Sequence, residues 1–149
     1  MHNLSIMEVK EYKQDEDINV FYVQAETFPQ GIQDSFKKLH DITGGFEGRH
    51  MYGITLCLGD ELVYRACIKE NLKGEGGQYS LSTYTIPKGT YLYTTLNNWQ
   101  ENIGQIPALF DALMALPNVK KQSICLEDYV AGGGMLAMVQ QAYFCEPGG

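Results

Sequence analysis

Basic residues are scarce in this sequence. Its 149 residues include 11 lysines and arginines against 18 aspartates and glutamates, which gives a formal net charge of −7. Nucleic-acid-binding proteins need clustered positive charge, so we expect no nucleic-acid partner. A negative surface favours cationic small molecules, but it also simply keeps a protein in solution. The charge alone leaves both interpretations open.

Long apolar runs are absent as well. No stretch approaches the roughly 18 apolar residues that a membrane-spanning helix requires. The N-terminus lacks the basic segment followed by an apolar one that marks a secretory signal. We therefore expect a cytoplasmic protein with no membrane partner.

The cysteines form no Cys-x-x-Cys pair; they stand at Cys57, Cys67, Cys125 and Cys145. Three of them lie in apolar, strand-like segments, which indicates reduced, buried thiols. Cys57 and Cys67 flank a turn at residues 59–60, and pairing across that turn would place Cys57 opposite about Leu62. A disulfide between Cys57 and Cys67 is therefore not expected.

Motifs for metals and cofactors are missing too. The histidines, His2, His40 and His50, lack ligand spacing among themselves or with acids. The glycines at 132–134 are not followed by Lys-Ser/Thr, so they indicate a hairpin turn rather than a phosphate-binding loop. There is no Gly-x-Ser-x-Gly elbow. We expect neither a metal nor a cofactor.

The sequence does contain a regular order of strand-like and helix-like segments. A helix is predicted from Gln30 to Ile42, where apolar residues recur at steps of four, three and three. Glycines at 44–45 end it. A second helix is predicted over residues 106–116, with Pro107 in its first turn and Pro117 after its end. Strands are predicted at residues 6–12, 18–26, 51–58, 61–69, 79–86, 90–96, 123–129 and 135–143.

One of the turns has a specific signature. Residues 87–89, Pro-Lys-Gly, are typical of a tight reverse turn. The strands at 79–86 and 90–96 are therefore predicted to form a hairpin.

The two halves of the chain correspond at an offset of 74 residues. Ile32 then corresponds to Ile106 and Gly59 to Gly133, with no gap from the helix through the hairpin. The order of elements repeats as β-α-β-β, in residues 6–70 and again in 79–143. We predict an α+β fold in one domain over residues 1–149, an antiparallel sheet with two helices on one face. A groove between the helices would be the natural ligand site.

Three segments in this order resemble the GyrI-like small-molecule-binding domains, which also serve as effector-binding domains of multidrug-sensing transcription regulators. Residues 51–54 resemble the family's Tyr-Gly-Ile strand, residues 84–91 its Ile-Pro-Ala-Gly hairpin and residues 126–129 its Phe-Glu-x-Tyr strand. Leu126 departs from the usual phenylalanine, and residues 135–143 carry less charge than the family's last strand. The resemblance covers about residues 6–143 and implies the same duplicated fold.

Glu127 is the leading candidate for a functional residue, because it is a charge within a strand-like segment. A lone buried carboxylate is costly, so this one must be exposed or partnered in a pocket. Strand alternation places Cys125, Glu127 and Tyr129 on one face, and Asp128 on the other. The resemblance implies that Glu127 reaches the groove and meets cationic ligands; a solvent-facing acid is the alternative.

Aromatic residues supply the other candidates. Ten tyrosines are present, and those in strand-like segments are Tyr22, Tyr52, Tyr91, Tyr93 and Tyr129. Trp99, the single tryptophan, precedes the second helix, at the expected mouth of the groove. Aromatic faces with one carboxylate suit a lipophilic cation. Tyrosines are also common on half-buried strands, and Trp99 could merely cover the core, so these alternatives stay open.

Three functions are compatible with these features. The first is a stand-alone small-molecule-binding protein for lipophilic cationic or aromatic compounds. The second, which the resemblance implies, is a hydrolase of reactive cyclopropane-containing compounds, with Glu127 as its general acid or base. The third is a protein-interaction module of the gyrase-inhibitor kind. We rank them in that order.

Overall fold

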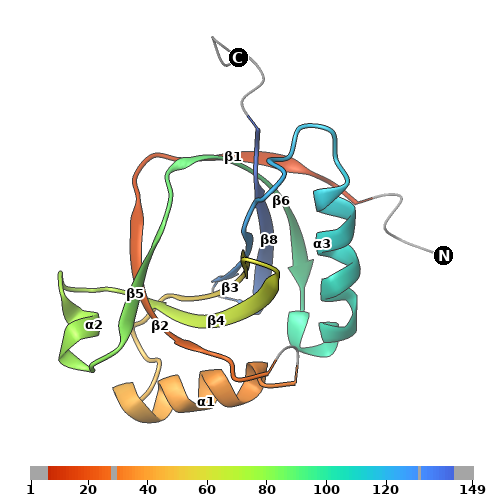
Figure 1. The fold of residues 1–149 in the computed structure, drawn as a ribbon. Helices are drawn as coiled ribbons and strands as arrows, with labels where there is room; N and C mark the ends of the chain where they lie inside the picture. The colour runs from red at the N-terminus through yellow and green to blue at the C-terminus, as the bar shows by residue number, and fades with distance from the viewer. Residues whose placement is uncertain (1–6, 28–29, 131, 143–149) are drawn as a thin grey trace. The chain divides into compact units, whose positions relative to one another are not determined.

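The computed structural model describes residues 7–27, 30–130 and 132–142. The predicted strand ends at Ile6 and Tyr143, and Cys145, lie outside the described residues. The chain divides into two compact units. We call residues 16–88 the central unit, and residues 7–15 with 89–142 the terminal unit (Figure 1).

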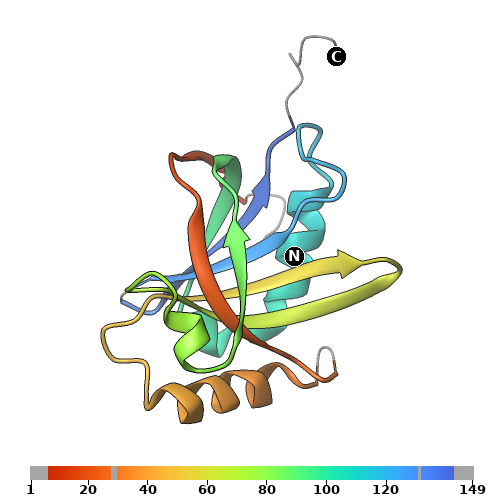
Figure 2. The ribbon, with the colours of Figure 1, turned by 60° about the vertical axis from the view of Figure 1, so that its left-hand side comes forward.

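The central unit contains four antiparallel strands that are hydrogen-bonded in the order β3-β4-β2-β5. The helix α1 packs on one face of this sheet, where Phe21, Leu39, Ala66 and Ile68 form the core. Figure 2 shows β3 and β4 as a long hairpin. The elements are β2 (Ile18–Gln24), α1 (Ile32–Thr43), β3 (Met51–Leu58), β4 (Glu61–Lys69), α2 (Glu75–Gln78) and β5 (Ser82–Ile86).

The terminal unit also contains four antiparallel strands, hydrogen-bonded in the order β1-β6-β8-β7. The helix α3 packs on one face of it, and Leu109 and Leu113 meet Met135, Ala137 and Val139 of β8 there. Its elements are β1 (Lys10–Gln14), β6 (Gly89–Asn97), the 3-10 turns η2 (Trp99–Glu101) and η3 (Ile103–Gln105), α3 (Ile106–Met114), β7 (Cys125–Val130) and β8 (Gly134–Gln140).

Each unit therefore contains the predicted β-α-β-β order. It appears as β2-α1-β3-β4 in the central unit and β6-α3-β7-β8 in the terminal unit. The two long helices begin at Ile32 and Ile106, at the predicted offset of 74. The α+β fold class is confirmed. The assignment of residues 1–149 to one domain stays a prediction.

The hairpin predicted around residues 87–89 is wrong. β5 pairs with β2, whereas β6 pairs with β1 and β8. β5 thus adds a fourth strand to the central unit, and β1 adds one to the terminal unit. The Pro-Lys-Gly signature reports only the local turn. Which strands pair depends on which apolar faces are buried together, and a short motif does not encode that.

The gap-free correspondence through the second hairpin is also wrong. In the central unit Tyr52 pairs with Cys67. At an offset of 74 the corresponding pair in the terminal unit would be Leu126 with Gln141, but Leu126 pairs with Met138. The terminal hairpin is therefore three residues shorter, so Gly133 does not correspond to Gly59.

Other local predictions hold. The strands at 51–58 and 61–69 have the predicted limits, joined by a two-residue turn in which Gly59 has φ +66°. Cys57 pairs with Leu62, as expected, so it does not face Cys67. Cys57 is exposed, however, so the prediction of a buried thiol is wrong at this position, whereas Cys67 is buried. Residues 71–77 lie between two predicted strands, and the short helix α2 begins within them at Glu75. In the described part of the chain, no helix is long and apolar enough to cross a membrane.

Candidate functional site

Glu127 lies in the middle of β7, directly opposite Ala137 of β8. Directly opposed residues of antiparallel strands share a face, so Glu127 shares one with Ala137, which belongs to the core beneath α3. Cys125 and Tyr129 pack on the same core. The alternation predicted from the sequence is therefore confirmed, and Glu127 faces the helix-covered side of its sheet.

Burial excludes one of the two interpretations of Glu127. Only 7% of its surface is exposed, so it is not a solvent-facing acid. The Tyr129 hydroxyl donates a hydrogen bond to Glu127 Oε1 over 2.5 Å. A hydroxyl donor to a carboxylate is among the stronger neutral-to-charged hydrogen bonds. Tyr129 thus orients the carboxylate without cancelling its charge.

Trp99 joins this pair through Tyr129. The two ring centroids lie 4.8 Å apart with the planes tilted by 57°. Trp99 opens the 3-10 turn η2 directly after Asn98, whose φ of +52° is left-handed and turns the chain at the end of β6. Trp99 is half-buried against the terminal core. We call Glu127, Tyr129 and Trp99 the acid-aromatic cluster.

Tyr91 and Tyr93 do not belong to this cluster. Tyr93 pairs with Met138, which alternates with Ala137 along β8, so both tyrosines lie on the opposite face from Glu127. Tyr91 is 1% exposed and packs as part of the interior, while Tyr93 is half-buried.

Tyr22 and Tyr52 belong to the central unit, on its face opposite α1. Tyr52 is buried and stacks on His50, with centroids 4.5 Å apart and an interplanar angle of 4°. The guanidinium of Arg65 lies over the Tyr22 ring, with Cζ 4.3 Å from the ring centroid. A cation of the chain itself therefore already occupies one face of Tyr22.

A buried ion pair in the central unit escaped the sequence analysis. Arg49 Nη2 lies 2.8 Å from Glu75 Oε2 and donates to the Tyr79 hydroxyl at 3.3 Å. The backbone N–H of Asn71 donates to the other oxygen of Glu75. The hydrogen bond from Arg49 lowers the pKa of Glu75 against the opposing effect of burial, and the pKa of Arg49 is raised in return. No spacing pattern in the sequence predicts an ion pair between residues that are 26 positions apart.

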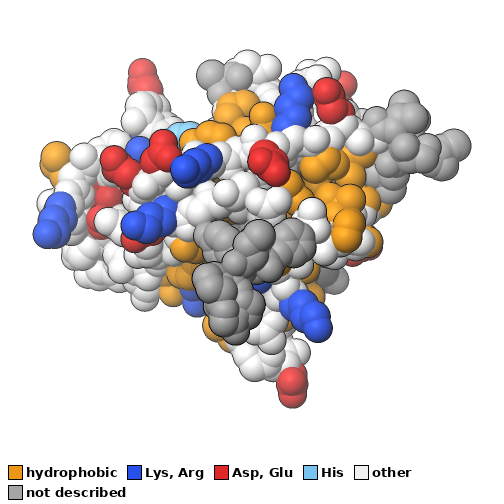
Figure 3. All heavy atoms as spheres, turned by 90° about the horizontal axis from the view of Figure 1, so that it is seen from above, with side chains coloured by type: hydrophobic (Ala, Val, Ile, Leu, Met, Phe, Trp, Pro, Cys, Tyr) orange, Lys and Arg blue, Asp and Glu red, His pale blue; other side chains and the backbone are white. Residues whose placement is uncertain are grey.

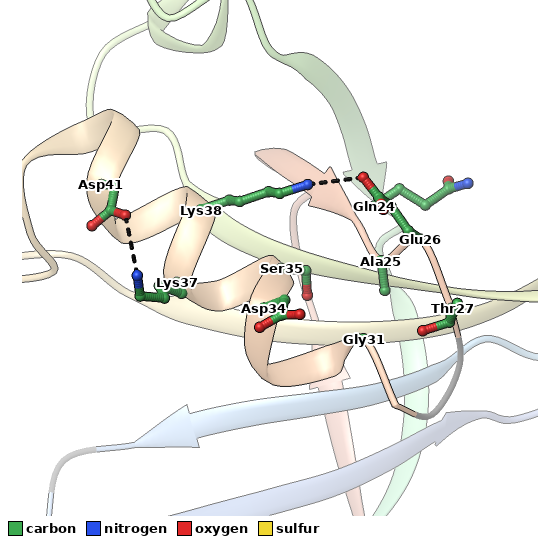
Figure 4. A pocket seen from close by; sticks show the side chains of 10 residues that line it. All are labelled: Gln24, Ala25, Glu26, Thr27, Gly31, Asp34, Ser35, Lys37, Lys38 and Asp41. Atoms are coloured by element: carbon green, nitrogen blue, oxygen red, sulfur yellow. Dashed lines mark hydrogen bonds and ion pairs between the residues drawn. The ribbon is translucent and has the colours of Figure 1, made fainter.

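A hollow of about 370 Å³ lies in the central unit, between the end of β2 and the first turns of α1 (Figure 4). Four of the five charged side chains that line it form two ion pairs. Lys38 contacts Glu26 at 3.0 Å and Lys37 contacts Asp41 at 4.0 Å. Asp34 is the fifth charged side chain, so the hollow has a formal net charge of −1, and the two exposed pairs contribute little stability.

Charged side chains of both signs are interspersed on the face shown in Figure 3. Within the described residues, no group of three or more His, Cys, Asp or Glu side chains could hold a metal ion.

The chain is similar to several solved structures. An integron cassette protein from the mobile metagenome of Vibrio cholerae has a TM-score of 0.63 and 13% identity, covering 91% of this chain and 95% of that one. SAV2435, solved bound to tetraphenylphosphonium, has a TM-score of 0.59 and 11% identity, covering 90% and 94%. A hydrolase from Listeria innocua has a TM-score of 0.58 and 8% identity, covering 91% and 92%. Identities this low show a shared fold.

No protein-family model matches the chain, and no curated protein matches it.

Proposed function

We propose that this protein is a GyrI-like small-molecule-binding protein that binds lipophilic cations through the acid-aromatic cluster. The observation that carries the proposal is the buried carboxylate of Glu127, held by the Tyr129 hydroxyl at 2.5 Å. A negative charge in an apolar setting interacts more strongly with a cation than it would in water. The shared fold with SAV2435, which was solved with a lipophilic cation, supports the same ligand class.

The aromatic members of the cluster fit this ligand class. The Tyr129 and Trp99 rings, 4.8 Å apart, offer apolar area and electron-rich faces beside the carboxylate. Charge and ring contact together favour a large, weakly hydrated cation over a small, strongly hydrated one. Sodium or ammonium would gain the charge attraction but little from the rings.

The test uses tetraphenylphosphonium and its isosteric anion, tetraphenylborate, with calorimetry and thermal shift. We expect the wild type to prefer the cation. Glu127→Gln should weaken binding of the cation about 10- to 100-fold, because it removes a partly desolvated charge. Asp128→Asn is the matched control, since it removes an adjacent charge on the opposite face of β7. Equal losses in the two variants, or no preference for the cation, would refute the proposal.

The second candidate is a hydrolase, and the Glu127–Tyr129 hydrogen bond favours it specifically. A buried carboxylate beside a hydroxyl can act as a general acid or base. The fold similarity to the Listeria innocua hydrolase is compatible with such a reaction. A turnover assay with an electrophilic cyclopropane-containing substrate tests it. Activity that disappears in Glu127→Gln would establish the reaction, and no turnover by the wild type at high protein concentration would exclude it for that substrate.

A further inference from the structure

Arg65 is the one charged residue in the otherwise apolar stretch 62–68 of β4. It lies opposite Gln24 of β2, on the face away from α1, since Ala66 and Ile68 alternate with it and face the α1 core. The side chain is half-buried. A charge in such a segment needs a partner, by the reasoning that first singled out Glu127.

Two tyrosine rings hold the Arg65 guanidinium. Its Cζ lies 4.3 Å from the ring centroid of Tyr22 and 5.6 Å from that of Tyr84. Nε donates to Oε1 of Gln24 over 3.1 Å, which fixes the rotation of the guanidinium plane. Tyr22 and Tyr84 come from β2 and β5, which pair directly. Arg65 is thus presented in one orientation by three strands.

The guanidinium still has unused hydrogen-bonding capacity. It carries five N–H donors, and only the Nε–H has an acceptor among the described residues. No carboxylate of the described residues forms an ion pair with Arg65. By contrast, Arg49 in the same unit has Glu75 at 2.8 Å. The Nη edge of Arg65 therefore carries a positive charge that the described part of the chain does not neutralise.

We propose that Arg65 is the anchor of a second binding site, which takes the carboxylate of an aromatic small molecule. The two Nη groups form a planar fork that matches the two oxygens of a carboxylate. The parts of the Tyr22 and Tyr84 rings that the guanidinium does not cover supply the apolar contact for the ligand's aromatic body. This site is separate in residues and in ligand charge from the acid-aromatic cluster, so it does not depend on the function proposed there.

The test compares 2-naphthoate with its neutral counterpart, 2-naphthamide, by calorimetry. We expect the wild type to bind the carboxylate about ten-fold more tightly or better. Arg65→Gln should remove this preference. Lys69→Gln, which removes an exposed cation from the same face of β4, should keep it. Glu127→Gln should keep it as well.

Each other result overturns the proposal. A wild type without preference for naphthoate shows that the fork takes no carboxylate. A preference that survives in Arg65→Gln shows that Arg65 only packs on its two rings. Equal losses in Arg65→Gln and Lys69→Gln indicate general attraction of an anion to a positive surface.

A measurement on the unaltered protein covers the case in which Arg65→Gln does not fold. The ¹⁵N resonances of the Arg65 guanidinium are followed by NMR during titration with naphthoate. We expect the Nη signals to shift with saturation, and naphthamide to leave them in place. Signals that do not respond to naphthoate would overturn the proposal without any variant.

Discussion

The terminal unit buries Glu127 and the central unit buries Glu75, with exposures of 7% and 6%, but their partners differ. Glu75 meets the guanidinium of Arg49 and a backbone N–H, so its charge and its oxygens are used by the fold itself. Glu127 receives the neutral hydroxyl of Tyr129. The comparison teaches that burial alone does not identify a functional acid, because buried Glu75 serves an ion pair within the fold.

The repeat of the β-α-β-β unit allows the position of Glu127 to be compared between the two units. Glu127 corresponds to Gly53 at the offset of 74, and each faces the helix-covered side of its sheet, opposite Ala137 and Ala66 respectively. The central unit therefore has no side chain where the terminal unit has a carboxylate. The two copies of one architecture differ in charge at the same position.

The largest predicted effect concerns Glu75. Glu75→Gln should lower the free energy of unfolding by about 3–5 kcal/mol, because it leaves the Arg49 charge buried without its carboxylate. Chemical denaturation measures this. Asp41→Asn, which breaks the exposed pair with Lys37, should cost no more than about 0.5 kcal/mol. Equal costs for the two variants would contradict the structural role of Glu75.

Gly76 tests how closely the turn beside Glu75 packs. A Cβ at Gly76 would lie 2.7 Å from Cβ of Phe21 and 3.0 Å from Cγ2 of Thr83. Gly76→Ala should therefore destabilise the protein by about 1–3 kcal/mol. Gly77→Ala in the same short helix meets nothing within 4 Å and should be neutral or slightly stabilising. Thermal unfolding of both variants checks this; a stable Gly76→Ala would show that α2 packs loosely on β2.

Tyr129→Phe tests whether the hydroxyl holds the carboxylate of the terminal unit. Its loss removes a donor from buried Glu127 and should cost about 1–2 kcal/mol of stability. It should also weaken binding of tetraphenylphosphonium, though less than Glu127→Gln does. Tyr93→Phe, on the opposite face, is the control and should change neither quantity. An unchanged stability in Tyr129→Phe would mean that the hydrogen bond contributes nothing.

The pH dependence of stability should also trace to Glu75. Its pKa in the folded protein lies below the ordinary value of 4.5, chiefly because of the hydrogen bond from Arg49. The unfolded chain then binds more protons in acid, so the contribution is present above pH 4.5 and is lost as pH falls through the folded pKa. The slope for this single group is at most about 1.4 kcal/mol per pH unit. Urea unfolding in acid should show a smaller slope in Glu75→Gln; an unchanged slope would assign the dependence to other acids.

Much of the local structure could be predicted because its causes are local. Alternation and turn chemistry predict β3 and β4 to their end residues, and an apolar stripe with Pro107 predicts where α3 begins. The same alternation predicts that Glu127 and Tyr129 share a face. A charge in an apolar strand needs a partner, and this rule points to Glu127 in β7 and equally to Arg65 in β4.

The amino-acid sequence by itself therefore determined the elements, the β-α-β-β order and the facing of Glu127. Only the tertiary structure decided that β1 pairs with β6 and β5 with β2, and that Arg49 meets Glu75. It also decided that Tyr129 donates to Glu127 while Arg65 covers Tyr22. The reason is that periodicity and turns act over a few residues. Strand partners and ion pairs are instead selected by which distant surfaces are buried together and by whether each buried charge finds a donor or a counterion.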